Sequence, residues 1–262
     1  MALAQLFFNE DRSIAVVTIN RPDVLNAIDV PTARAIHDVV VQLPAEANLR
    51  AVILRGAGRA FVSGGDVAAF AADFDKTADV VGEMLAALNP VVLTLRSVGV
   101  PVLASVHGAV AGAGISLMCA ADLVIASQDT RFMLAYNRVG APPDCGGTWF
   151  LPRLIGQRKA AEFMYLGDIW DAATAKQAGL INVVVPADRL VQETDALAER
   201  LASGATRAFA MFKQLTNEAF DRSLPEQLAL ERSAFQAATR TEDFRDAVRA
   251  FLDKKPAKFH GK

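Results

Sequence analysis

The pattern of apolar and polar positions predicts strands that alternate with helices over the first 188 residues. Helices are predicted to begin near Asp29, where Pro31 suits the first turn, and to cover residues 159–166 and 172–178. Strands alternating with helices indicate an α/β fold. Runs rich in β-branched and apolar residues, bounded by glycine or proline, are typical of strands. Five such runs occur, at residues 13–19, 50–56, 101–107, 123–127 and 181–185.

The pattern changes after about residue 188, because apolar residues then recur every three or four positions and no further strand-like run appears. This spacing predicts amphipathic helices. Residues 1–188 are therefore predicted to form the core, and residues 189–262 a helical appendage. Since the apolar faces of these helices need a partner, we expect them to pack on the core or on another subunit.

The stretch of residues 97–121 contains no charged side chain and is long enough, by length alone, for a membrane span. It also contains Pro101, His107 and four glycines, which fit a buried strand, a turn and a buried helix better. We therefore expect no membrane-spanning segment. The N-terminus lacks the basic start and long apolar run of a signal peptide.

Charge and cysteine usage narrow the classes of function. The chain has 27 Lys and Arg residues and 29 Asp and Glu residues. It therefore lacks the excess of positive charge that is typical of proteins that bind nucleic acid. Cys119 and Cys145 form neither a CxxC pair nor a disulfide framework, so a reduced, cytoplasmic protein is expected. The three histidines do not cluster, so no metal site is expected.

Two turns that contain glycine follow predicted strands. The first reads FVSGGDV over residues 61–67, and the second reads HGAVAGAG over residues 107–114 and leads into an apolar helix. Glycine lets the backbone turn sharply, and the first N–H groups of a helix lack partners within it. If the turns converge, two backbone donors can hold an oxyanion. Taken singly, each turn is equally well explained as a tight connection.

The second turn also resembles the phosphate turn of short-chain dehydrogenases. Those enzymes need a tyrosine followed by lysine four residues later, whereas Tyr136 is followed by Gly140 and Tyr165 by Ile169. A dinucleotide turn also belongs after the first strand of its unit, not in the middle of the chain. A nicotinamide cofactor is therefore not expected.

Five segments, in the same order, resemble the crotonase (enoyl-CoA hydratase/isomerase) superfamily over nearly the whole chain. They are RPxxxNA at residues 21–27, the two glycine turns, the stretch that runs from the GGT segment through LPRLIG to GDIWDAATAKQAGLINVVVP, and the ending FLDKKPAKFHGK. The resemblance implies a spiral of ββα units with a C-terminal helical region that forms homotrimers, or dimers of trimers. It also implies acyl-CoA substrates, with coenzyme A entering as part of the thioester and no separate cofactor.

The resemblance further implies that the backbone N–H groups of Ser63 and Ala113 form the oxyanion hole. Removal of a thioester α-proton puts charge on the carbonyl oxygen, and one such donor contributes about 3 kcal/mol to its stabilisation. Asp66 is assigned to the structure of the first turn and not to chemistry. The residues implied to surround the thioester are Ser63, Gly64, Gly65, Asp66, Gly112 and Ala113.

Four more residues are implied to contact coenzyme A. Val24 and Leu25 match positions near the adenine end. Phe251 and Lys254 match positions that often reach the cofactor of a neighbouring subunit. The alternative is that Phe251 is core and Lys254 is solvated.

The acid and base residues depart from the hydratase pattern. A typical hydratase uses two glutamates, and the matching positions here are Ser116 and Tyr136, which cannot serve as general bases at neutral pH. The segment PPDCGGTW at residues 142–149 resembles isomerases of phenylacetate degradation (PaaG type), in which the matching aspartate, here Asp144, is the acid/base. By itself, Pro-Asp-x-Gly also suits a turn or helix cap.

The leading interpretation is an enoyl-CoA isomerase that shifts a double bond, or rearranges a ring, through an enolate with Asp144 as its one acid and base. The alternatives are a 2-enoyl-CoA hydratase of fatty-acid or aromatic-acid catabolism and a non-catalytic acyl-CoA-binding relative. Residues 70–89, rich in alanine and phenylalanine, are predicted to form a loop that shapes the acyl pocket. Tyr136 either lines that pocket or belongs to the core.

Overall fold

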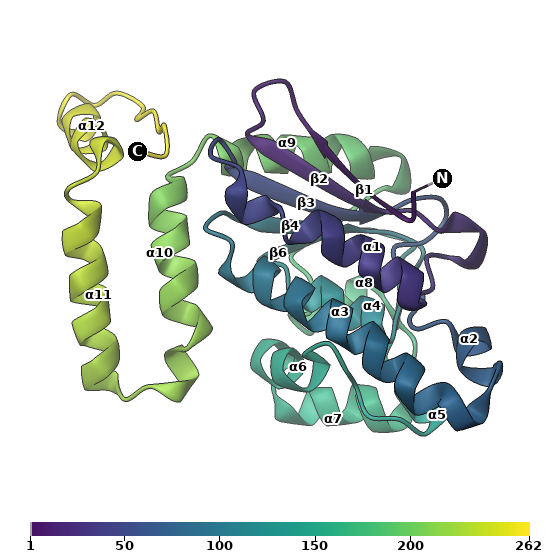
Figure 1. The fold of residues 1–262 in the computed structure, drawn as a ribbon. Coiled ribbons are helices and arrows are strands. Elements are labelled where there is room, and N and C mark those ends of the chain that lie inside the picture. The colour runs from purple at the N-terminus through teal and green to yellow at the C-terminus, as the bar shows by residue number, and fades with distance from the viewer. Residues whose placement is uncertain (1) are drawn as a thin grey trace.

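The computed structural model describes residues 2–262, which build a central mixed sheet of six strands (Figure 1). The first strand is antiparallel to its neighbour and the remaining pairs are parallel. In spatial order the strands are β1 (Ala4–Phe8), β2 (Ile14–Ile19), β3 (Ala51–Gly56), β4 (Val102–Val106), β6 (Leu123–Ser127) and β9 (Val183–Val185). A smaller sheet consists of β5 (Ala109–Ala111), β7 (Arg131–Met133) and β8 (Trp170–Asp171).

Helices connect these strands and follow them. In chain order they are α1 (Val30–Val40), α2 (Val67–Ala71), α3 (Thr77–Ser97), α4 (Ala113–Cys119), α5 (Tyr136–Val139), α6 (Gly147–Ile155), α7 (Gln157–Leu166), α8 (Ala172–Gln177), α9 (Leu190–Ala202), α10 (Thr206–Asn217), α11 (Leu224–Ala238) and α12 (Glu242–Leu252).

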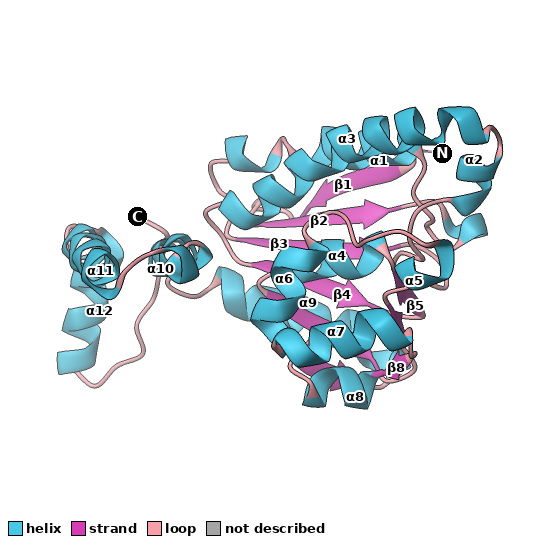
Figure 2. Cartoon of the chain, turned by 90° about the horizontal axis from the view of Figure 1, so that it is seen from below, coloured by secondary structure: helices cyan, strands magenta, loops and turns pink. Residues whose placement is uncertain are grey.

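The large sheet is buried on both faces, as expected for parallel strands with continuous apolar runs. Successive residues of β3 point to opposite sides: Val52 and Leu54 join the larger core cluster with residues of α1, α3 and α4, while Ala51 and Ile53 join a second cluster with residues of α9. Figures 1 and 2 show helices on both sides of the sheet. The α/β fold and the five predicted strands are confirmed.

The helical appendage predicted for residues 189–262 divides into two parts. Its first helix, α9, packs on the sheet and belongs to the core. The last three helices, α10 to α12, form an arm that stands beside the body (Figure 1). Lys213 of α10 anchors the arm, because its Nζ donates to the carbonyls of Leu95 (2.7 Å) and Val100 (3.2 Å) and contacts Asp122 Oδ2 (2.7 Å).

The prediction that residues 70–89 form a loop is wrong. These residues instead span the end of α2, a 3₁₀ turn and more than half of α3, which continues through Pro90. Within residues 2–262, the segment 74–97 is the one helix long and apolar enough to cross a membrane by length and composition. One face of α3 is buried in the core through Met84, Leu88 and Leu95.

The uncharged stretch of residues 97–121 forms the predicted strand, turn and helix. It contains β4, β5 and α4, and every residue of α4 is buried. The start of α1 also follows the prediction, since Asp29 Oδ1 accepts a hydrogen bond from the N–H of Thr32 (2.8 Å).

Candidate active site

The two glycine turns converge at one end of the large sheet. Val62, in the first turn, bridges Val110 of β5, and its carbonyl accepts the N–H of Ala111 (2.9 Å). The glycines then meet: a Cβ placed on Gly64 would lie 3.4 Å from the Ala111 carbonyl oxygen and 3.8 Å from the Cα of Gly112. Both glycines have positive φ, +110° and +51°, which a side chain would make unfavourable.

Asn26 holds the first turn in place. Its side chain is fully buried, and Oδ1 accepts the N–H of Arg21 (2.7 Å). Its Nδ2 donates to the carbonyls of Ala57 (2.8 Å), Ala60 (2.8 Å) and Phe61 (3.1 Å). One side chain therefore ties the segment after β2 to the backbone that leads into Ser63.

The backbone donors near the meeting point differ in their partners. The N–H groups of Gly64 and Ala113 have no hydrogen-bond acceptor within residues 2–262. The N–H of Ser63 donates to the carbonyl of Leu25 at 3.1 Å. Of the two donors implied by the family resemblance, Ala113 is thus unengaged and Ser63 is engaged.

A cavity of about 580 Å³ opens beside these turns. Its walls come from the first turn, from α2 and α3, and from the segment between α5 and α6. Asp144 is the only carboxylate among the lining residues, which are Ser63, Gly64, Gly65, Val67, Phe70, Val81, Met84, Leu85, Asn89, Gly112, Ala135, Tyr136, Val139, Ala141, Pro142, Pro143, Asp144, Cys145 and Gly146.

Asp144 is joined to Tyr136 by a short hydrogen bond. The Tyr136 hydroxyl donates to Asp144 Oδ1 at 2.6 Å. The backbone reaches this arrangement through Ala135 and Cys145, two residues other than glycine with left-handed φ of +61° and +48°. The Asp144 carbonyl accepts the N–H of Gly147 (2.8 Å), so Asp144 does begin a turn, as the alternative interpretation has it. Its side chain does not cap α6, so the helix-cap part of that interpretation is wrong.

The groups around Asp144 are neutral. Burial, and then the negative charge of Asp144, raise the pKa of Tyr136 far above its ordinary value. The same two causes, in the same order, raise the pKa of the Cys145 thiol. Tyr136 is therefore a protonated donor at neutral pH, and it is both buried and part of the cavity wall.

Ser116, the other position at which a hydratase carries glutamate, lies behind this pair. Its side chain is fully buried, and its Oγ has no hydrogen-bond partner within residues 2–262. A Cβ placed on Gly147 would lie 2.7 Å from that Oγ, so Ser116 packs directly beneath the start of α6.

Asp66 has a structural role, as predicted. Its Oδ2 pairs with Arg21 Nη1 at 2.6 Å, and its Oδ1 accepts the N–H groups of Ala68 (3.1 Å) and Ala69 (3.4 Å) at the start of α2. The Arg21 hydrogen bond is the main cause that lowers the pKa of Asp66 below 3.8. Asp66 is not among the residues that line the cavity.

The implied coenzyme A contacts fall into two places. Val24 and Leu25 adjoin the cavity through Ser63, whose Oγ donates to the Val24 carbonyl at 3.5 Å. Phe251 lies in the last turn of α12, and Lys254 follows the end of that helix, in the arm (Figure 1). Phe251 is 81% exposed, so the alternative that it is core is wrong. Its contact with a neighbouring subunit stays a prediction.

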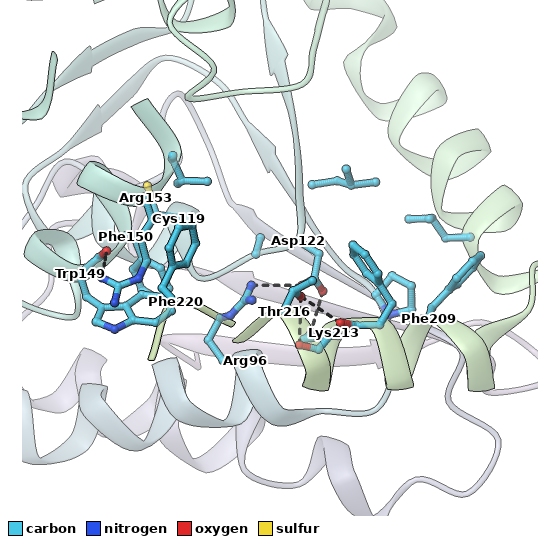
Figure 3. Close-up of a pocket in the computed structure, with 16 residues that line it drawn as sticks. Arg96, Cys119, Asp122, Trp149, Phe150, Arg153, Phe209, Lys213, Thr216 and Phe220 are labelled. Carbon is cyan, nitrogen blue, oxygen red and sulfur yellow. Dashed lines mark hydrogen bonds and ion pairs between the residues drawn. The ribbon is translucent and has the colours of Figure 1, made fainter. Parts of the chain in front are cut away.

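A second cavity of about 400 Å³ lies between α6 and α10 (Figure 3). Its one carboxylate, Asp122, contacts Arg96 Nη1 (3.1 Å) and Lys213 Nζ (2.7 Å). The Arg153 guanidinium lies 4.0 Å from the centre of the Trp149 ring. Because its acid is neutralised by two cations, this cavity offers no free base, and we place the candidate active site in the first cavity.

The sequence did not predict which α3 residues line the cavity or that Tyr136 contacts Asp144. Val81, Met84 and Leu85 are three and four residues apart, which is a helical signal that a reading of this segment as a loop overlooks. The contact with Asp144 depends on two left-handed residues that nothing in the sequence marks.

Comparison with known proteins places this geometry in a family. The model of the family described as enoyl-CoA hydratase/isomerase matches residues 9–262. A probable enoyl-CoA hydratase of Rhodobacter capsulatus is 38% identical over the full length of both chains. A 1,2-epoxyphenylacetyl-CoA isomerase of Escherichia coli is 34% identical, covering 96% of this chain and 97% of that protein. A crystal structure of a putative enoyl-CoA hydratase/isomerase from Mycobacterium abscessus superimposes with a TM-score of 0.92 at 33% identity, covering 99% of this chain and 100% of that one.

Proposed function

Because the chain belongs to the enoyl-CoA hydratase/isomerase family, we propose that it shifts the double bond of an enoyl-CoA thioester, with Asp144 as its one acid and base. The observation that carries this proposal is that, within residues 2–262, Asp144 is the only carboxylate lining the cavity beside the two glycine turns. Relatives named as hydratases and as isomerases both match the chain, so the choice between the two reactions rests on this site.

One carboxylate is sufficient for isomerisation. Asp144 takes a proton from the α-carbon of a β,γ-enoyl thioester, and the electron pair moves into a dienolate whose charge rests on the thioester oxygen. The protonated Asp144 then returns that proton to the γ-carbon, which leaves the α,β-enoyl product. No water is consumed and the enzyme ends as it began. Addition of water instead needs one group to deprotonate water while another protonates the α-carbon.

The dienolate oxygen is proposed to lie between the N–H groups of Ala113 and Ser63. Each such donor stabilises the developing charge by about 3 kcal/mol. Ala113 has its N–H unengaged at the start of α4, where the helix also contributes partial positive charge. Ser63 has to share its N–H with the substrate or release the Leu25 carbonyl when the thioester enters.

The acyl chain is proposed to occupy the apolar part of the cavity, between α2, α3 and the segment that follows α5. The coenzyme A part of the bound substrate is proposed to extend out of the cavity past Val24 and Leu25. Phe251 and Lys254 of the arm are proposed to reach the cofactor of a neighbouring copy, in a homotrimer or a dimer of trimers. Exposed apolar side chains on the arm support an assembly of this kind, and they include Phe212, Phe220, Leu224, Leu228, Phe235, Phe251 and Leu252.

The test compares wild type, Asp144→Ala and Asp168→Ala on trans-3-hexenoyl-CoA and trans-2-hexenoyl-CoA. Double-bond migration and water addition are followed separately by chromatography of the products. Asp168 is exposed and lies outside the cavity, so its substitution controls for the loss of a carboxylate. We expect wild type and Asp168→Ala to isomerise the substrate at the same rate, and Asp144→Ala to isomerise it about a hundredfold or more slowly.

Two outcomes would contradict the proposal. Efficient hydration by wild type that is indifferent to Asp144→Ala would mean that the base lies elsewhere. Tight binding of the thioesters without turnover of either would favour the alternative of a non-catalytic acyl-CoA-binding protein.

A further inference from the structure

Two buried hydroxyl groups, those of Tyr136 and Ser116, lie near Asp144, and a single acid/base does not by itself require them. Tyr136 and Ser116 stand at the two positions where the family resemblance implies glutamates in hydratases, and both side chains are buried. Tyr136 bonds directly to Asp144 at 2.6 Å. The Ser116 hydroxyl is fully buried and lies near the phenol, although no hydrogen bond between the two meets ordinary geometry.

We propose that Tyr136 is a positioning residue for Asp144, which holds one carboxylate oxygen so that the other faces the cavity as the base. Ser116 supports Tyr136 from beneath. This inference rests on the proposed function, because it assigns Tyr136 a role through the acid/base of that reaction.

Geometry favours such a role. The terminal torsion of an aspartate is broad, so a carboxylate without a partner samples many orientations in its cavity. A hydrogen bond to Oδ1 restricts that torsion and leaves Oδ2 as the oxygen that can meet a substrate carbon. Proton transfer requires the base within hydrogen-bond reach of the proton, so a fixed orientation raises the rate without adding affinity for the substrate.

Charge favours the same role. An ionised carboxylate in an apolar cavity is costly unless it is hydrogen-bonded, and a donor to the ionised form stabilises that form. Among residues 2–262, no lysine or arginine lines the cavity that could stabilise the ionised form instead. The other titratable groups that line the cavity are Tyr136 and Cys145, both held protonated by burial and by Asp144. Tyr136 is therefore the side chain of the lining that donates a hydrogen bond to the Asp144 carboxylate.

The experiment uses the fact that the chain has two tyrosines. Tyr165 is 78% exposed on α7 and lies outside the cavity, so Tyr165→Phe serves as the matched control for Tyr136→Phe. Turnover of trans-3-hexenoyl-CoA is measured from pH 4 to pH 9 for wild type and both variants. Tyr136→Phe is expected to lower kcat about tenfold to a hundredfold with KM changed much less, and to move the acid limb of the kcat profile to higher pH by about one unit. Ser116→Ala is expected to change kcat and the acid limb of the kcat profile in the same directions, but by smaller amounts.

A second measurement does not depend on how well Tyr136→Phe folds. Growth of the Tyr165→Phe variant on difluorotyrosine labels position 136 alone. The more acidic phenol donates a stronger hydrogen bond, so the acid limb is expected to move to lower pH, opposite to the effect of Tyr136→Phe. The ¹⁹F resonance of this label is expected to shift when Asp144→Asn is added.

Three results would overturn the proposal. The first is an unchanged pH profile of kcat in both the Tyr136→Phe and fluorotyrosine proteins, and the second is an equal fold loss of kcat from Tyr136→Phe in the presence and absence of Asp144→Asn. The third is a ¹⁹F resonance that does not shift when Asp144→Asn is added. The measurement of the ¹⁹F resonance needs no turnover. A protein that fails to isomerise but shows the ¹⁹F coupling would refute the proposed function and leave the Tyr136–Asp144 contact standing.

Discussion

Substitution of Asn26 by alanine tests how the first glycine turn is held. The side chain makes one bond from Arg21 N–H to Oδ1, and its two amide hydrogens are shared among the carbonyls of Ala57, Ala60 and Phe61. Asn26 is fully buried, so alanine would leave these partners without water. About three full hydrogen bonds are lost, and each unpaired buried group costs about 1–3 kcal/mol, which gives about 3–5 kcal/mol after partial relaxation.

The backbone adds a second cost. Asn26 has a φ of +57°, which asparagine tolerates better than alanine. Alanine at this position costs about 1 kcal/mol more, so the total for Asn26→Ala is about 4–6 kcal/mol. That is a large share of the 5–15 kcal/mol typical of folded domains. We expect reduced yield, and any folded fraction is expected to have lower activity on enoyl-CoA thioesters because Ser63 follows directly from the released segment.

The assay is urea denaturation followed by circular dichroism, with all variants at one protein concentration because assembly would couple stability to concentration. Asn26→Gly is the matched control: it loses the same hydrogen bonds but accepts the positive φ, so it should unfold at a urea concentration between those of wild type and Asn26→Ala. A destabilisation below about 1 kcal/mol for Asn26→Ala would refute the reasoning, because it would mean that water or neighbouring groups satisfy these carbonyls.

Three further predictions follow from contacts of single residues. The Arg21 hydrogen bond lowers the pKa of Asp66 below 3.8. The ionised Asp66 side chain therefore contributes its full stabilisation above pH 3.8 and loses it as the pH falls through the lowered pKa. In urea titrations, Asp66→Asn should be less stable than wild type at pH 7, and the difference should shrink below about pH 3.8. Gly114→Ala should cost about 1–3 kcal/mol and most of the activity, because its Cβ would lie 2.3 Å from a backbone oxygen, whereas Gly82→Ala, with nothing within 4 Å, should be neutral or stabilising. Lys213→Met should lower the free energy of unfolding by about 2–3 kcal/mol, because it removes a buried ion pair and two hydrogen bonds to carbonyls; an unchanged urea midpoint would mean that this lysine does not anchor the arm.

The sequence predicts the centre of the fold well and its margins poorly. The buried parallel strands have continuous β-branched runs that few other structures explain, and all five were located. The strands β5, β7 and β8 contain only two or three residues, too few to show a period. Residues 70–89 were predicted to form a loop, whereas burial of one face maintains helix α3 through both Gly82 and Pro90.

The candidate site divides in the same way. The two turns were predicted from local glycine motifs, and Asp144 was predicted from the resemblance of its segment to a family, because Pro-Asp-x-Gly alone also suits a turn. The partner of Asp144 was not, since Tyr136 reaches it only through left-handed backbone at Ala135 and Cys145. Alanine and cysteine adopt that conformation rarely, and then where the surrounding structure holds them in it, so the contact is a product of the folded structure and not of the local sequence.

The same contact explains why the reaction is proposed to be proton transfer between carbons and not addition of water. A water molecule in the cavity would need a base in addition to Asp144. Tyr136 cannot supply one at neutral pH, because burial and the charge of Asp144 hold its proton, and that proton is already donated to Asp144. Ser116, at the other position where hydratases have glutamate, is a neutral hydroxyl buried beneath the start of α6. Replacing two acids with two hydroxyls therefore removes the base for water and leaves one oriented carboxylate, which is what moving a proton from one carbon to another requires.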